Sequence, residues 1–234
     1  MAKESIIGKL NQYYEIKANV RYTGQHVPIR QLVTPNDPEV KEVAAILHAS
    51  GDFVDNAWTF VHSFTAYARE EGDYWRTPAE SLANPEALDC DDLAILLCSI
   101  LRNFIPAEKV FCAVVMWTYK GETDGHMAVV IQDENGHERI LESTAAPDIP
   151  VVGTYAVYAL FNDQYALATK AGLDLFDLRP IVQVQGDYDR RSGVPRSDAE
   201  RAVNHYGISV DEYYLHPEHY PLPERGSNLL VSSY

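Results

Sequence analysis

Cys90 stands between two carboxylic acids in the stretch "EALDCDDLAILLCSILR", which runs from Glu86 to Arg102. Asp89 and Asp91 flank the thiol, and an apolar pattern of helical spacing follows it. A cysteine on the first turn of a helix can be a nucleophile, because the free backbone N–H groups there favour the thiolate. The alternative is a small buried residue, which is the default for a free cysteine. A nucleophile further requires a base and a group that orients the base.

Two later residues could supply these groups. His126 opens the strand-like stretch "GHMAVVI", and Glu142 lies on the following one, "ILEST". The turn "ENGH" between them predicts a hairpin, which makes His126 and Glu142 cross-strand neighbours. A nucleophile on a helix, a base on one strand and a carboxylate on the next meet the geometric requirements of a catalytic triad. Taken singly, His126 is typical of a strand-end surface residue and Glu142 of a strand-edge carboxylate.

The elements that must position these residues follow one another as helices, then strands. "TPNDPEVKEVAAILHAS" predicts a helix that begins after Pro and Asp, and "DNAWTFVHSFTAYARE" predicts a second one. The apolar stripe expected on the second helix consists of Trp58, Val61, Phe64 and Ala68. "TPAESL" carries a capping-box pattern, and "KVFCAVVMWTY" predicts a strand buried on both faces before the hairpin. This order predicts an α+β fold with N-terminal helices packed on an antiparallel β-sheet.

Four of these stretches together resemble a known family. "YWRTPAESL", "DCDDLAILLCSILR", "GHMAVVI" and "LEST" are similar in order and spacing to the transglutaminase-like superfamily, in particular its microbial cysteine-proteinase branch. The resemblance covers roughly residues 36–150 and implies a papain-like core. It also implies that Cys90 is the nucleophile, His126 the general base and acid, and Glu142 the orienting carboxylate.

The resemblance leaves two positions open. Family members most often carry Asp where this chain has Glu142, and Glu reaches about one methylene further. Trp75 matches the family's Trp before the nucleophile. It is expected to line the acyl pocket, to contribute to the oxyanion site, or to pack in the core. The backbone N–H of Cys90 is a further oxyanion donor.

The resemblance divides the chain into three predicted segments. Residues 1–35 form an N-terminal extension, 36–150 the transglutaminase-like catalytic core, and 151–234 a C-terminal extension that packs on the core. The last segment ends in a partly irregular tail with one helical candidate near residues 197–205. The tail is rich in tyrosine, with Tyr206, Tyr213, Tyr214 and Tyr220. Its role stays open between a lid, a packing extension and an interface, and the oligomeric state is not predicted.

Charge and composition exclude several classes of function. A net charge of −15 argues against nucleic acid or an anionic membrane surface as the main partner, since both are bound through Lys and Arg. No apolar run approaches the length of a membrane span. The first 17 residues, "MAKESIIGKLNQYYEIK", lack the features of a secretory signal, so we expect a cytoplasmic protein.

Neither a metal site nor a cofactor site is predicted. The three cysteines contain no C-x-x-C pair. "HPEH" brings His216 and His219 together, but Pro217 disfavours the helix that would place both on one metal. "DCDD" lacks the spaced ligands and the Gly of an EF-hand loop, and no Walker or dinucleotide-binding fingerprint occurs.

Residues and resemblance together predict a cysteine hydrolase or acyltransferase that acts on amide bonds of a peptide or protein. Thiolate attack gives a thioester, which water resolves in a peptidase or amidase and an amine resolves in a transglutaminase. Hydrolysis is favoured, because amine transfer needs a site that excludes water. The alternative from another class is a catalytically silent papain-like scaffold that binds a peptide or a partner protein.

Overall fold

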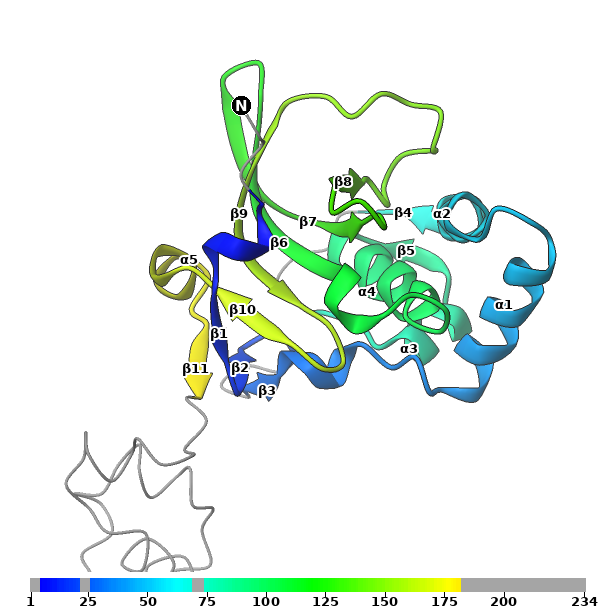
Figure 1. Cartoon of the computed structure of the whole chain (residues 1–234), viewed down its shortest axis with the longest axis horizontal. Coiled ribbons are helices and arrows are strands. Elements are labelled where there is room, and N and C mark those ends of the chain that lie inside the picture. Colours follow the sequence, from blue (N-terminus) through cyan, green and yellow to red (C-terminus); the bar gives the residue numbers. More distant parts are fainter. Residues whose placement is uncertain (1–4, 22–25, 69–73, 182–234) are drawn as a thin grey trace, which may run out of the picture. The chain divides into compact units, whose positions relative to one another are not determined.

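The computed structural model describes residues 5–21, 26–68 and 74–181 of the 234 (Figure 1). The chain divides into two units, Met1–Val182 and Gln183–Tyr234, and all the described residues belong to the first. The predicted helix near residues 197–205, the tyrosine-rich tail and the "HPEH" pair lie outside the described residues.

The predicted starts of the first helix and of the capping-box helix are confirmed. Helix α1 (Pro38–Ala49) begins after Asp37, whose side chain accepts hydrogen bonds from the first free backbone N–H groups. Helix α3 (Pro78–Ala83) begins with a complete capping box between Thr77 and Glu80. The remaining helices are α2 (Phe53–Phe64), α4 (Cys90–Leu101), α5 (Lys170–Leu175), and the 3₁₀ turns η1 (Ile7–Lys9), η2 (Ile29–Leu32) and η3 (Ala107–Lys109).

The predicted extension of the second helix to Ala68 is wrong. Helix α2 ends at Phe64, and the following Thr65 is extended. The backbone N–H groups of Ala66 and Ala68 donate to the carbonyls of Pro85 and Leu88 instead of to the preceding turn. This makes β4 (Ala66–Tyr67) the parallel partner of β5 (Glu86–Leu88), which leads directly into Cys90. The stripe therefore stops at Val61, and the Phe64 side chain is exposed.

The main sheet has six strands in the order β1-β10-β9-β6-β7-β8, all antiparallel. The predicted meander supplies β6 (Val110–Tyr119), β7 (Glu122–Gln132) and β8 (Glu138–Leu141), with Gly136 at positive φ in the hairpin turn. The other strands are β1 (Asn11–Tyr13), β9 (Thr154–Phe161) and β10 (Ala166–Ala168). Strands from all three predicted segments thus share one sheet, and β9 lies beside β6 at its centre (Figure 1).

Smaller pairings complete the fold. Strands β11 (Arg179–Ile181), β2 (Glu15–Ala18) and β3 (Val27–Pro28) form a second antiparallel sheet. The helices α1–α4 gather on one side of the main sheet, with α4 against β6 and β7 (Figure 1). The structure is therefore of the predicted α+β class, with helices on an antiparallel sheet.

Helix α4 is the centre of the core. Every residue from Asp91 to Leu101 is buried, and its aliphatic side chains pack against Cys112, Val114, Met127 and Val129 on the sheet. Burying one Leu or Ile side chain contributes roughly 1.5–3 kcal/mol. A helix buried on all sides cannot shift along its axis without repacking these contacts. The first residue of α4, Cys90, therefore has a fixed position against β7.

None of the described helices combines the length and the apolar character needed to cross a membrane.

Candidate active site

Cys90 is the first residue of α4 and is half-buried. Ala87, in β5 and three residues before it, has φ of 62°, a left-handed conformation that costs a residue with a Cβ roughly 1–2 kcal/mol. The Ala87 carbonyl accepts a 2.8 Å hydrogen bond from the Arg76 guanidinium. Strand β5, which leads into Cys90, is thus held from the segment before α3.

The same arginine binds the helix start a second time. Asp92 is fully buried, and its carboxylate accepts from the backbone N–H of Arg76 at 2.7 Å and from the Arg76 guanidinium at 3.1 Å. Asp92 therefore makes structural hydrogen bonds at the start of α4. A buried carboxylate paired in this way is costly to remove, because the partner charge would be left without its partner.

Trp75, the residue before Arg76 in the chain, is 7% exposed. Its ring stacks on Phe161 with centroids 5.9 Å apart, and its backbone N–H donates to the Val20 carbonyl. It also lines the pocket that contains Cys90. Core packing and a place in the pocket wall are therefore both observed, and a role at the oxyanion stays a prediction.

His126 and Glu142 are in direct contact. The Nε2 atom of His126 lies 2.9 and 3.1 Å from the two carboxylate oxygens of Glu142. His126 stands on β7 opposite Val115 of β6, and Glu142 is the first residue after β8. The hairpin that the sequence predicts brings the pair together.

Glu142 has further partners that the sequence did not suggest. The hydroxyl of Tyr155 donates to one carboxylate oxygen at 2.7 Å, and the hydroxyl of Thr144 donates to the other at 2.7 Å. The Thr144 backbone N–H adds a third donor at 3.3 Å. Trp58 of α2 fixes the same segment from the helical side, since its indole N–H donates to the carbonyls of Glu142 and Ala145. The sequence could have indicated Thr144, because it lies only two residues after Glu142 and Ser/Thr hydroxyls often bond to near neighbours in the chain. Tyr155 lies on β9, and no local sequence pattern connects it with Glu142.

These contacts settle the charge of Glu142. Burial alone would raise its pKa, but the hydrogen bond and charge of His126, with the Tyr155 and Thr144 hydroxyls, outweigh burial and lower the pKa. Burial and the Glu142 charge together raise the pKa of Tyr155. Glu142 is therefore an anion and Tyr155 a neutral donor at neutral pH.

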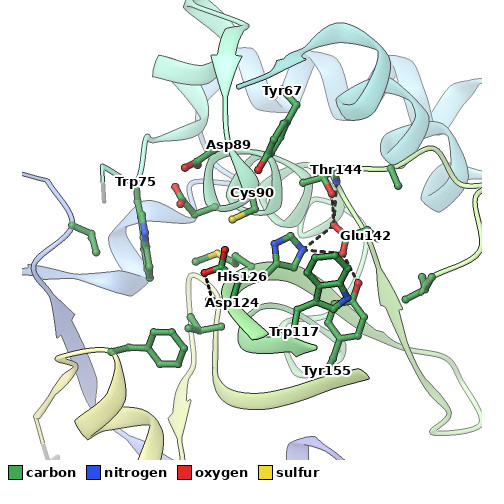
Figure 2. Close-up of a pocket in the computed structure, with 18 of the residues that line it drawn as sticks. Tyr67, Trp75, Asp89, Cys90, Trp117, Asp124, His126, Glu142, Thr144 and Tyr155 are labelled. Carbon is green, nitrogen blue, oxygen red and sulfur yellow. Dashed lines mark hydrogen bonds and ion pairs between the residues drawn. The ribbon is translucent and has the colours of Figure 1, made fainter. Parts of the chain in front are cut away.

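Cys90, His126, Glu142 and Trp75 all line one pocket of about 1070 Å³. Figure 2 shows the His126 ring projecting between Cys90 on the helix side and Glu142 on the sheet side. The described contacts include no hydrogen bond between the Cys90 thiol and the ring. In a protein without bound substrate such a gap is common, because catalytic hydrogen bonds tighten when substrate binds.

The electrostatic surroundings of Cys90 differ from the expectation. The helix start predicts a lowered pKa, but burial, followed by the charge of Asp91, raises the pKa of the thiol. Asp89 and Glu142 add to the rise, and the backbone N–H of Met127 opposes it. The thiol is therefore protonated at neutral pH in this state of the protein.

A small cluster of potential metal ligands also lies here. One donor atom each of Asp89, Cys90 and Asp91 falls within 4.8 Å of the others. Calcium takes six to eight oxygen ligands, and a thiol is not among those it prefers. Three donors on consecutive residues do not make such a site, and the absence of a metal stays a prediction.

Comparisons with known proteins give only a distant likeness. No protein-family model matches the chain, and no curated protein matches it significantly. The chain is similar to solved structures of LapG from Legionella pneumophila. The calcium-bound form is 17% identical with a TM-score of 0.39, over 56% of this chain and 88% of LapG. The EGTA-treated form is 18% identical with a TM-score of 0.41, over 61% of this chain and 84% of LapG. At these values no residue role or activity can be transferred to this chain.

Proposed function

We propose that the protein is a thiol peptidase or amidase of the transglutaminase-like type, with Cys90 as nucleophile, His126 as base and acid, and Glu142 as the orienting carboxylate. The observation that carries the proposal is one pocket in which a cysteine at a helix start and a hydrogen-bonded His-carboxylate pair lie together. This is the constellation that nucleophilic catalysis by a thiol requires.

The carboxylate selects the form of the ring that can act as a base. Because Glu142 is an anion, it accepts the proton on Nε2 of His126. The neutral ring then carries its lone pair on Nδ1, which is the atom left to receive the proton of the Cys90 thiol. Glu142 also stabilises the imidazolium that forms.

The reaction follows from these roles. The Cys90 sulfur attacks the amide carbonyl carbon while its proton passes to Nδ1 of His126. The carbonyl oxygen becomes an oxyanion, for which the backbone N–H of Cys90 is the donor at the helix start. His126 then protonates the amide nitrogen, the C–N bond breaks, and a thioester remains on Cys90. Water attacks the thioester, gives its proton to His126, and releases the acid as the thiol takes that proton back.

The raised pKa of Cys90 constrains the first step. A thiol that is protonated at rest must give up its proton before or during the attack. His126 is therefore needed for the attack itself and not only for the departure of the amine. The same observation favours a second candidate, a silent scaffold that binds peptides without cleaving them.

A library of terminally blocked octapeptides, with products and protein adducts located by mass spectrometry, tests the proposal. Wild-type protein is expected to cleave members of the library and to accumulate a hydroxylamine-sensitive acyl group on Cys90, whereas Cys90→Ala should do neither. Cys98→Ala, which removes another thiol of α4, should retain both activities. Binding of peptides with neither cleavage nor an acyl group would establish the silent scaffold instead.

The acyl acceptor is decided in the same assay. Addition of monodansylcadaverine should leave the free acid as the main product if water is the acceptor. Transfer of most of the acyl group to the dansylated amine would identify a transglutaminase.

A further inference from the structure

The pocket collects an unusual share of the exposed apolar side chains. Ten large hydrophobic residues are exposed in the described part of the chain, and five of them line this pocket, namely Tyr67, Ile149, Val151, Val152 and Leu175. Single exposed apolar residues are ordinary, but a gathering of them around one cavity marks a binding surface.

The segment between β8 and β9 is held firmly in this exposed position. Ile149, Val151 and Val152, here called the aliphatic wall, are 52%, 42% and 47% exposed. The indole N–H of Trp117 donates to the Val152 carbonyl at 2.8 Å. Gly153 has φ of 86° and lies so close to β6 that a Cβ would stand 2.5 Å from the Thr118 carbonyl oxygen. Only glycine fits there, so the segment that carries the aliphatic wall packs closely on β6.

The pocket also runs along the edge of a strand. Four consecutive residues of β7, from Asp124 to Met127, line it. Side chains of consecutive strand residues point to opposite faces, and Gly125 offers only backbone, so the pocket reaches the edge of β7 as well as the part of the sheet where Trp117 and Tyr155 line it. Strand β8 pairs only with residues 129–132 of β7. Among the described strands none pairs with the outer edge of β7 from Glu122 to Ala128, next to His126. On this edge the Gly125 N–H donates to the Asp124 side chain and the Met127 N–H to the Cys90 sulfur, so the backbone carbonyls are what the edge offers to a partner.

We infer that the site takes an extended peptide segment, which adds as a strand to the outer edge of β7 and places an aliphatic side chain against the wall formed by Ile149, Val151 and Val152. The backbone carbonyls of the strand edge accept hydrogen bonds from the peptide N–H groups, and the wall supplies selection of the side chain. This arrangement sets the scissile amide beside His126, whose own strand would bind the peptide. The inference rests on the proposed function and names its substrate class.

The wall is tested with the double variant Ile149→Ser/Val151→Ser and the control Ile46→Ser. Ile46 is 61% exposed on α1 and does not line the pocket. Octapeptides that carry Leu or Ser at one position are compared by kcat/KM. Loss of apolar contacts should reduce the preference for Leu about tenfold in the double variant and leave it unchanged in the control. The rate of alkylation of Cys90 by iodoacetamide, which needs no wall, should stay the same in both.

The strand edge is tested by binding of fluorescein-labelled octapeptides to the Cys90→Ala protein, with one backbone nitrogen methylated at a time. An added strand donates from alternate residues, so methylation should weaken binding with a period of two. This readout needs no chemistry, and so separates failure of the inference from failure of the proposed function.

Three results would overturn the inference. One is a Leu preference that survives in the double variant while Cys90→Ala abolishes cleavage, which leaves the proposed function intact. Another is a methylation series without alternation. The third is a dimer of the wild type that the double variant converts to a monomer with unchanged peptide preference, which would make the wall an interface between two copies of the chain.

Discussion

On the sheet side of the pocket, Glu142 receives hydrogen bonds from His126, Tyr155 and Thr144, whereas on the helix side burial, followed by the charges of nearby carboxylates, raises the pKa of Cys90. The proposed base and its partner are therefore hydrogen-bonded to each other, while the proposed nucleophile is protonated. In the proposed mechanism, reactivity is limited at the thiol, and the sheet side must supply the driving force for its deprotonation.

The largest effect is expected from removal of His126, the proposed base on the sheet side of the pocket. His126→Ala should lower peptide hydrolysis by about 10²–10⁴-fold, because the protonated thiol would have no acceptor for its proton. Steady-state kinetics on a cleaved octapeptide would measure the loss. His137→Ala is the matched control, since that side chain is 80% exposed in the β7–β8 turn and should leave the rate unchanged. Equal rates for His126→Ala and wild type would remove His126 from the mechanism.

A change at Glu142 should have different effects on His126 and on Cys90. Glu142→Gln should reduce hydrolysis by about 10²-fold, because an amide can present its own N–H to Nε2 and favour the wrong tautomer of His126. The same substitution removes a negative charge that raises the pKa of Cys90, so the pH midpoint of iodoacetamide labelling should fall. Glu142→Asp, which keeps the carboxylate, should retain more activity than Glu142→Gln. A labelling midpoint that rises in Glu142→Gln would contradict this account of the charges.

On the helix side, Asp91→Asn should make the thiol more acidic. Burial is the main cause of the raised pKa of Cys90 and would persist, but the charge of Asp91 is the next cause and would be gone. The pH midpoint of iodoacetamide labelling at Cys90, followed by peptide mass spectrometry, should therefore move down. Asp55→Asn, an exposed acid on α2, is the control. An unchanged midpoint in Asp91→Asn, with an unchanged melting temperature, would show that the charge of Asp91 does not contribute to the raised pKa.

Much of the scaffold could be predicted because its signals are local. Asp37 and Thr77 are residue types that cap helix N-termini, and each predicts the helix that follows it. The hairpin turn is predicted by Gly136, which has positive φ. The apolar run after Cys90 predicts a buried helix, and α4 is one. The hairpin that sets β8 beside β7 is again a local property, but its last pair is Val129 with Leu141, so the contact of His126 with Glu142 is made by side chains beyond the paired residues.

The features that the sequence did not predict depend on contacts between distant segments. Tyr155 reaches Glu142 because β9 pairs with β6 and sets Tyr155 opposite Trp117, a register that no local pattern specifies. The end of α2 at Phe64 depends on pairing with β5, more than twenty residues later. The pKa of Cys90 was misjudged because the helix start is visible in the sequence, whereas the burial of the thiol is not.

The smallest effect is expected from Tyr155→Phe, which leaves the ring and removes one donor to Glu142. The Tyr155 hydroxyl lowers the pKa of Glu142, so its loss should raise that pKa, and the acid limb of the pH–rate profile should move to higher pH. One hydrogen bond to a charged group is worth roughly 1.5–3 kcal/mol, but His126 and Thr144 still hold the carboxylate, so we expect a loss in kcat of only about three- to tenfold. Tyr119→Phe, near the tip of the β6–β7 hairpin, is the control and should change neither quantity. A loss in kcat without a shift of the acid limb would mean that Tyr155 acts through packing. A shift of the acid limb would show that the pKa of Glu142 depends on a residue of β9, a strand outside the β7–β8 hairpin, and that β9 is part of the proposed active site.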